Sequence, residues 1–465
     1  MMRLRLLLPL GLAAVLPMRA QIPLRLEDVL TQVEQNYPPF LAALGDREIA
    51  DAEVLQALGR FDFLMSAQAD TDRFGYYQNQ RFNVGFDQPL ATWGSSVYGG
   101  WREGAGDYAP YSGLLQTRSG GEFRGGVKLP LLRNREIDDR RGNLNKARIG
   151  TRLADLSIDQ QRLAVRQMAA RRYWDWVASG QRLLVGKQML RVAQERDAAL
   201  REASNLGQIP AIEVTENQRQ ILQRRSQVVE AERGVQQSAI ELSLFYRSAD
   251  GHPRLATEEQ LPPTMPQTAL LSEDALTRDL ATALGRRPEI ERLKQQGEQT
   301  RVDIRMAEND AKPAVDLAVG FTAESGTGPV RRGPNEMKAS LRFEMPYQRR
   351  AAQGKLAAAE AKLRQVSRRE EFARNQVEAE VRDAASALRT AHNRAVLLRQ
   401  EVEVSLDLAD AERERFRLGD STLFTVNLRE QAAVDAELRS VSAIGDYLRA
   451  LTVYEQVTAR ALATP

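Results

Sequence analysis

The chain has 465 residues, of which 27% are charged and only 6% are aromatic, a composition that is poor for large globular cores and favours long helices. Its 65 basic and 62 acidic residues nearly balance, which gives no sign of a nucleic-acid tract or a strongly basic membrane-binding surface. Cysteine is absent, which excludes disulfides, thiolate metal sites and thiol catalysis.

Residues 1–20 are predicted to be a secretory signal peptide. Arg3 and Arg5 precede an apolar stretch at 6–16, and Met18-Arg19-Ala20 stand before the expected cleavage at Gln21. A short membrane anchor is the alternative because Met18 is unusual two residues before a cut, although eleven apolar residues are too few to span a bilayer. No later apolar run approaches the roughly 18 residues of a spanning helix, so any membrane insertion must use strands.

The two halves of the chain repeat one another. The offset between them stays at 212 residues from Gly142, paired with Gly354, to Gly207, paired with Gly419, which predicts helices of equal length. Prolines concentrated between 252 and 266 predict a linker between the halves. In chain order, the predicted segments are an N-terminal helical segment at 21–60, a first β-hairpin with an aromatic, glycine-rich loop at 61–130, a first long helical hairpin at 131–250, the linker at 251–272, a second helical segment at 273–312, a second β-hairpin at 313–346 and a second long helical hairpin at 347–465.

Apolar and polar residues alternate with a period of two in the predicted strands. In the second repeat the pattern covers 315–321 and 337–345, and in the first it covers 61–67 and 123–129. One apolar and one polar face are expected where lipid lies on one side and water on the other, but the edge of a soluble sheet alternates in the same way. Four strands are too few for a membrane barrel, whose minimum is about eight, so several chains would have to share one barrel.

Residues 76–111 combine tyrosines and tryptophans with many glycines. Such aromatic residues are typical of membrane interfaces, and an aromatic-rich surface loop is the alternative. Because Phe82, Val84 and Phe86 also alternate, this region is a candidate for an additional strand pair that the second repeat lacks.

Long helices follow each predicted hairpin of strands. No proline or internal glycine occurs between Gly354 and Leu418, a length of roughly 100 Å at about 1.5 Å per residue. Apolar or small residues recur at steps of four and three from Val377 to Ala409, which indicates a helix packed along a seam or, alternatively, a free coiled-coil dimer. Gly207 and Gly419 each stand where a helical pattern stops and resumes, so two-helix hairpins with tips at these glycines are predicted.

The chain resembles the TolC family of outer-membrane efflux and secretion proteins over nearly its whole length after residue 20. The resemblance is carried by the duplication and by the motifs Arg287-Pro288-Glu289-Ile290, Phe416-Arg417-Leu418-Gly419, Thr425-Val426-Asn427-Leu428 and Tyr447-Leu448. It implies a mainly α fold with a small β part, and a homotrimer whose chains give four strands each to a 12-stranded outer-membrane β-barrel continued by a periplasmic α-helical barrel. The implied location is the outer membrane of a Gram-negative bacterium, with a large periplasmic part.

The resemblance also implies partners and docking residues. A periplasmic membrane-fusion (adaptor) protein would dock at the tips and couple the duct to an inner-membrane pump or ABC exporter. The expected docking residues are Leu206, Gly207, Gln208, Leu418, Gly419 and Asp420.

In this family a tyrosine, an arginine and aspartates close the tunnel at the tips. Spacing from the tip glycines places Phe416 at the tyrosine, Ser421 at the arginine, Glu213 at the first-repeat aspartate, and Thr425 and Leu428 at the second-repeat acids. Only Glu213 keeps its chemistry, and a solvated helix charge is its alternative reading. The familiar locking bonds lack their hydroxyl and guanidinium donors here, so the familiar gate is not expected to operate.

The resulting function hypothesis is a passive exit duct of a tripartite efflux or type I secretion system, opened by adaptor docking at the tips. The alternative is a secreted periplasmic coiled-coil scaffold without a channel. An enzyme is not expected, because His252 and His392 stand beside no plausible nucleophile or ligand set, and neither a metal nor a cofactor is predicted.

Overall fold

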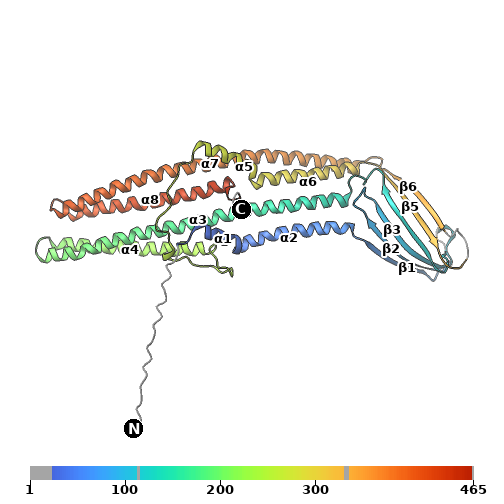
Figure 1. Cartoon of the computed structure of the whole chain (residues 1–465), viewed down its shortest axis with the longest axis horizontal. Helices are drawn as coiled ribbons and strands as arrows, with labels where there is room; N and C mark the ends of the chain where they lie inside the picture. The colour runs from blue at the N-terminus through green and yellow to red at the C-terminus, as the bar shows by residue number, and fades with distance from the viewer. Residues whose placement is uncertain (1–22, 113–115, 329–334, 463–465) are drawn as a thin grey trace, which may run out of the picture. The chain divides into compact units, whose positions relative to one another are not determined.

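The computed structural model describes residues 23–112, 116–328 and 335–462, so the predicted signal peptide lies outside the described residues. The chain divides into two compact units, each built from both halves of the sequence (Figure 1). The sheet unit takes its described residues from Pro38–Val165, Ser272–Ala385 and Tyr454–Pro465. The hairpin unit takes its described residues from Met1–Tyr37, Arg166–Leu271 and Ser386–Val453.

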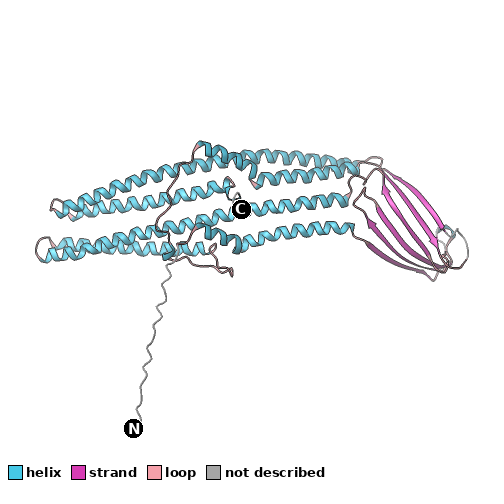
Figure 2. Ribbon diagram, in the orientation of Figure 1, coloured by secondary structure: helices cyan, strands magenta, loops and turns pink. Residues whose placement is uncertain are grey.

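The described part of the sheet unit holds one antiparallel sheet of six strands in sequence order (Figure 2). Its strands are β1 (Leu64–Asp72), β2 (Asn79–Pro89), β3 (Ser96–Gly106), β4 (Glu122–Pro130), β5 (Ala314–Glu324) and β6 (Asn335–Glu344). The strand β4 of the first repeat pairs with β5 of the second, with Val127 opposite Val319, and this pairing joins the two repeats. The strands of both repeats therefore form a single sheet, but the first predicted hairpin does not form as expected, because β1 pairs with β2 and β4 with β3 instead of β1 with β4.

The expectation of four strands per chain is wrong: β2 and β3 add a strand pair within the region of the predicted loop. The alternation in β2 indicated this pair, but β3 hid it. Glycine stands at 99, 100, 104 and 106, and glycine weakens a strand and leaves no side chain to reveal a face. The strand β3 forms despite its weak strand propensity because it is hydrogen-bonded to β2 on one side and to β4 on the other.

The two faces of the sheet differ in polarity. One row across the six strands runs Met65, Phe86, Gly99, Gly125, Phe321 and Met337. The neighbouring row on the other face runs Ser66, Gly85, Gly100, Arg124, Thr322 and Glu336. The apolar face lies uncovered, since Met65 is 69% exposed, Phe321 51% and Met337 78%.

Among its described residues, the sheet unit also contains three complete α-helices, α2 (Pro38–Leu58), α5 (Glu273–Arg286) and α6 (Pro288–Asp310). Ser272 caps α5 by accepting a hydrogen bond from the backbone N–H of Ala275. Proline at the first position of α6 fits because that N–H has no helical partner. Buried Arg287, at the junction of α5 and α6, donates to Glu289, Glu380 and the Val457 carbonyl, which ties this junction to α7 and to the end of α8.

The hairpin unit consists of two helical hairpins and a short helix, α1 (Leu26–Asn36). One hairpin joins α3 (Asp139–Asn205) to α4 (Ala211–Ser243), and the other joins α7 (Arg350–Arg417) to α8 (Leu423–Val457). The first part of α3 and of α7 belongs to the sheet unit, and the rest to the hairpin unit. Trp176, Leu183, Leu242 and Leu448 form its buried core, and close approach of α8 to α3 is possible because Gly445 faces Ala178.

The proline-rich linker is packed onto this unit. A Cβ on Gly180 would lie 2.3 Å from the Leu261 side chain, so only glycine lets the linker approach α3 this closely. The Tyr447 hydroxyl exchanges two 3.0 Å hydrogen bonds with the backbone of Ala269. Tyr173 donates to the Leu24 carbonyl at 2.8 Å, and burial raises the pKa of its hydroxyl, which therefore keeps its proton.

The predicted duplication, with strands leading into a long helical hairpin in each half, is confirmed in the described residues. None of the described helices carries a stretch that is both long and apolar enough to cross a membrane.

Candidate functional site

The two hairpin tips have the same backbone geometry. Gly207 and Gly419 have φ of +71° and +81°, a left-handed conformation that glycine adopts without strain. The N–H of Gln208 donates to the Ala203 carbonyl at 2.9 Å, and that of Asp420 to the Arg415 carbonyl at 2.8 Å. Each glycine N–H also donates to the carbonyl three residues earlier, at 3.0 Å. The two bonds together are the Schellman pattern, which ends a helix and satisfies its last carbonyls.

The predicted docking residues Leu206 and Leu418 lie at these tips beside the glycines, and both are exposed. Ile212 and Phe424, in the first turns of α4 and α8, are also exposed. Each tip thus presents apolar side chains to solvent at equivalent positions of the two repeats.

The predicted gate residues do not form one cluster. Phe416, Ser421 and Thr425 are half-buried around the second tip, whereas Leu428 is exposed on α8. Glu213 is half-buried in the first turn of α4, and the described residues give its carboxylate no ion-pair partner. Thr425 instead helps to begin α8, since its N–H donates to the Thr422 hydroxyl at 3.3 Å.

Ser421 takes part in a network confined to the second hairpin. Its hydroxyl donates to the carboxylate of Glu412, a residue that is only 8% exposed. Arg415 lies 3.6 Å from that carboxylate and also donates to Asp420 at 3.2 Å. The network stabilises the turn between α7 and α8. Ser421, which stands at the position of the family's gate arginine, contributes a hydroxyl hydrogen bond to this turn.

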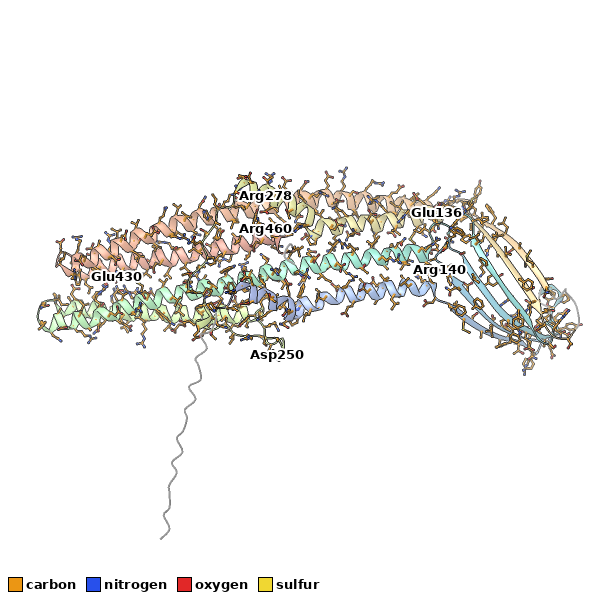
Figure 3. All side chains as sticks on the ribbon, in the orientation of Figure 1. Glu136, Arg140, Asp250, Arg278, Glu430 and Arg460 are labelled. Carbon is orange, nitrogen blue, oxygen red and sulfur yellow. The ribbon has the colours of Figure 1, made fainter. Side chains whose placement is uncertain are left out.

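Behind the tips lies a buried ion cluster that the sequence analysis missed. Glu430 on α8 is completely buried (Figure 3). Its carboxylate accepts hydrogen bonds from the guanidinium groups of Arg196 on α3, Arg224 on α4 at 3.0 Å, and Arg413 on α7 at 2.9 Å. We call these four residues the Glu430 cluster; it joins all four helices of the two hairpins.

Electrostatics keeps Glu430 ionised. Burial by itself raises the pKa of this carboxyl, but attraction to Arg196 and hydrogen bonds from Arg413 and Arg224 outweigh burial, and the pKa is lowered overall. All three arginines have further acceptors: Arg224 donates to the Met189 carbonyl at 2.9 Å, Arg196 to the Asn427 side chain at 3.1 Å, and Arg413 to the Asp410 carboxylate. The cluster still holds three cations for one carboxylate at its centre.

A signal for this cluster exists in the sequence. Val426, Glu430 and Ala433 follow one another at steps of four and three, so the glutamate occupies a position of the apolar seam, and all three are buried. On α4, Arg224 holds the same kind of position, seven residues after buried Asn217 and four before buried Val228. A charged residue in phase with a buried seam predicts a partner across it.

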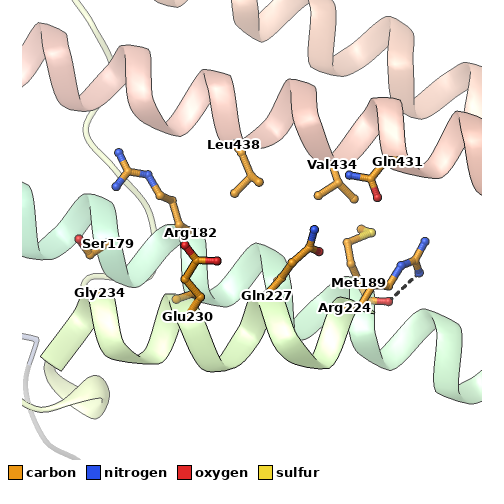
Figure 4. Close-up of a pocket in the computed structure, with 12 residues that line it drawn as sticks. Ser179, Arg182, Met189, Arg224, Gln227, Glu230, Gly234, Gln431, Val434 and Leu438 are labelled. Atoms are coloured by element: carbon orange, nitrogen blue, oxygen red, sulfur yellow. Dashed lines mark hydrogen bonds between the residues drawn. The ribbon is translucent and has the colours of Figure 1, made fainter. Parts of the chain in front are cut away.

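A hollow of about 390 Å³ adjoins the cluster between α3, α4 and α8 (Figure 4). Met189, Val434 and Leu438 provide its apolar lining, and Arg224 links it to the Glu430 cluster. Among the described residues there is no group of three or more histidines or acids that could hold a metal ion. The contacts around the hollow are side-chain packing and ion pairs.

Neither a protein-family model nor a curated protein matches the sequence. Solved structures do match. A membrane protein from Pseudomonas aeruginosa is 16% identical with a TM-score of 0.62, and the match covers 93% of each chain. The open state of the MtrE outer membrane channel from Neisseria gonorrhoeae is 15% identical with a TM-score of 0.62, over 93% of this chain and 88% of that one.

A third match, the CmeC outer membrane channel from Campylobacter jejuni, is 13% identical with a TM-score of 0.60, over 94% of this chain and 88% of that one. The chain has the fold of these outer-membrane channels. The TolC-family fold that the resemblance implied is thereby confirmed, including the order of strands and helices in both repeats. At these identities the likeness concerns the fold, so the individual side chains must be judged by their own contacts.

Proposed function

We propose that this protein is an outer-membrane exit duct of a tripartite efflux or type I secretion system, a passive conduit without chemistry of its own. The uncovered apolar face of the sheet carries the proposal. Phe123, Leu341 and Phe343 are all more than half exposed on it, and such a continuous face is stable against lipid rather than water. The fold shared with the MtrE outer membrane channel over 93% of the chain supports this reading.

The sheet also favours a homotrimer. Within the described residues β1 and β6 each pair on one side only, and six strands are fewer than the roughly eight that close a membrane barrel. Three copies would contribute 18 strands, with β6 of one chain beside β1 of the next. This barrel replaces the 12-stranded one inferred from four strands per chain.

Exposed apolar stripes on the helices support contacts between copies. Leu222, Val229 and Ile240 are exposed along α4, Leu244 directly after its end, and Leu397, Val404 and Leu408 along α7. Several of these residues are spaced by seven or four, as expected for helices packed side by side. Three hairpin units joined through such stripes would form the wall of an α-helical tunnel in the periplasm.

The tips are the proposed contact with a periplasmic adaptor protein, itself coupled to an inner-membrane pump or ABC exporter. Leu206, Gly207 and Gln208 would meet it at the first tip, and Leu418, Gly419 and Asp420 at the second. Exposed apolar side chains beside a rigid turn suit the docking of another helical hairpin. The large helical part then lies in the periplasm, and the sheet in the outer membrane of a Gram-negative bacterium.

Membrane fractionation and planar-bilayer recording test this function. The full chain is expected in the outer-membrane fraction, to migrate as a trimer in mild detergent, and to conduct ions after insertion into a bilayer. A soluble periplasmic dimer would instead support the coiled-coil scaffold. Replacing Phe321 by Arg should impair insertion, because an arginine on the lipid-facing side of a strand costs up to about 2–4 kcal/mol near the middle of the bilayer, while Thr322→Arg on the polar face should insert normally.

A further inference from the structure

The Glu430 cluster connects the two helical hairpins of one chain. Glu430 and Arg413 belong to the α7–α8 hairpin, whereas Arg196 and Arg224 belong to the α3–α4 hairpin. Two of the three bonds to the Glu430 carboxylate therefore cross from one hairpin to the other. The Arg196 side chain makes a second crossing bond, to Asn427 on α8.

The cluster lies close to the tips of the hairpins, where it can control the distance between them. Glu430 is the eighth residue of α8, so it lies about 11 Å along the helix from its first residue at 1.5 Å per residue. The equivalent stretch of α4 contains Asn217, whose side chain donates to the Ala193 carbonyl on α3. The layer directly behind the tips is thus held by polar contacts, whereas the core further along contains Trp176, Leu183 and Leu242.

Polar contacts of this kind are strong when complete and easily lost once water enters. When Glu430 separates from Arg196 and Arg224, water can solvate the exposed charges and recover part of the lost interaction free energy. When apolar side chains separate, the free energy cost grows with the apolar area exposed and is not recovered. The layer is also incompletely satisfied in the protein. Arg224 Nε, Asn217 Oδ1 and Asn427 Nδ2 are buried without a hydrogen-bond partner, which lowers the cost of hydrating this layer.

We propose that the Glu430 cluster is a latch that holds the α7–α8 hairpin against the α3–α4 hairpin near the tips, and that its release opens the duct. The second part rests on the proposed function. The latch replaces the closure residues that the sequence lacks at Phe416, Ser421, Thr425 and Leu428. It differs from a purely structural ion pair because it acts across the two hairpins rather than within one of them.

The absence of cysteine allows a clean distance measurement on the full-length protein. Spin labels are attached to Gln208→Cys and Arg417→Cys, one exposed position at each tip, and labelled chains are diluted among unlabelled ones. Pulsed electron paramagnetic resonance then reports the distance between the two tips of one chain. Glu430→Gln should lengthen and broaden the distribution, and should raise the bilayer current at least about tenfold, since leaving buried arginines unpaired shifts such an equilibrium by more than one decade.

Three further variants separate a latch from a structural ion pair. Arg196→Gln removes a bond across the hairpins and should lengthen the distance. Arg413→Gln removes a bond within the α7–α8 hairpin and should leave the distance unchanged. Glu401→Gln removes the exposed ion pair with Arg439 between α7 and α8 and serves as the matched glutamate control.

The outcomes are distinguishable. An unchanged distance in both Glu430→Gln and Arg196→Gln, or an equal change in Arg413→Gln, overturns the latch. If Glu430→Gln fails to fold, the comparison of Arg196→Gln with Arg413→Gln decides alone. Failure of the proposed function has another signature: the wild-type protein and all variants would lack bilayer conductance, whatever the distance between the tips.

Discussion

The two hairpin tips share one backbone and differ in the side chains that follow it. Both close with the same Schellman bonds around a left-handed glycine. Beyond the turn, the second hairpin carries the Ser421–Glu412 bond and the buried carboxylate of Glu430, whereas the first carries Glu213 without an ion-pair partner among the described residues and the buried cation of Arg224. The two repeats thus have the same turn, whereas their buried charges are of opposite sign and pair with each other, Glu430 of the second hairpin with Arg224 of the first.

The two hairpins should differ most in stability when one glutamate of each is replaced in turn, Glu430 on the second hairpin and Glu213 on the first. Glu430→Gln should lower the free energy of unfolding of the hairpin unit by about 3 kcal/mol or more, because breaking a buried ion pair leaves unpaired charges in the core. Glu213→Gln should change it by less than about 0.5 kcal/mol, as for surface positions. Urea unfolding followed by tryptophan fluorescence measures both, and equal effects would contradict the asymmetry between the hairpins.

A smaller, symmetrical effect is expected at the tip glycines. Gly207→Val and Gly419→Val should each destabilise the tip by about 1–2 kcal/mol, because an L-residue is strained at positive φ. Export should suffer more than trimer assembly, which native electrophoresis and an export assay compare. Gly354→Ala, within α7 and free of close neighbours, is the control and should be neutral or stabilising. Variants that export at the normal rate would argue against docking at the tips.

Ser421→Ala should weaken only the second tip, by about 1.5 kcal/mol, because it removes a hydrogen bond to a charged group. Faster amide hydrogen exchange is expected around residue 420 and not around residue 208. The equivalent residue of the first repeat, Ile209, has no such bond to lose, so Ile209→Ala should leave exchange at the second tip unaltered. Faster exchange at both tips would show that the two turns are coupled.

The smallest effect concerns pH. The pKa of Glu430 is lower in the folded protein than in the unfolded chain, so its contribution to stability is fully present above the ordinary glutamate pKa of about 4.3 and is lost as the pH falls through the lowered value. The stability difference between wild type and Glu430→Gln should thus stay constant from pH 7 to about pH 5 and shrink in stronger acid. A difference that shrinks near neutral pH would contradict the lowered pKa.

Much of the fold could be predicted from the sequence, because period and register are local properties. The constant offset between repeats identified helices of equal length, and the alternation in β5 and β6 identified their apolar face. The strand β3 could not be predicted in this way, since its glycines carry no pattern and its neighbours β2 and β4 supply the pairing. The Glu430 cluster escaped for a related reason: its members lie on four helices and meet only after packing.

The repeated unit, the length of its helices and the glycine turns at its tips could be predicted from the sequence, because each depends on residues close together in the chain. The packing of distant segments showed that the strands form one six-stranded sheet and that the linker contacts α3 through Leu261 and α8 through Tyr447. It also decided that a glutamate in a helical seam meets three arginines. A buried charge is stable only with its partners in place, and those partners are fixed by how the helices pack.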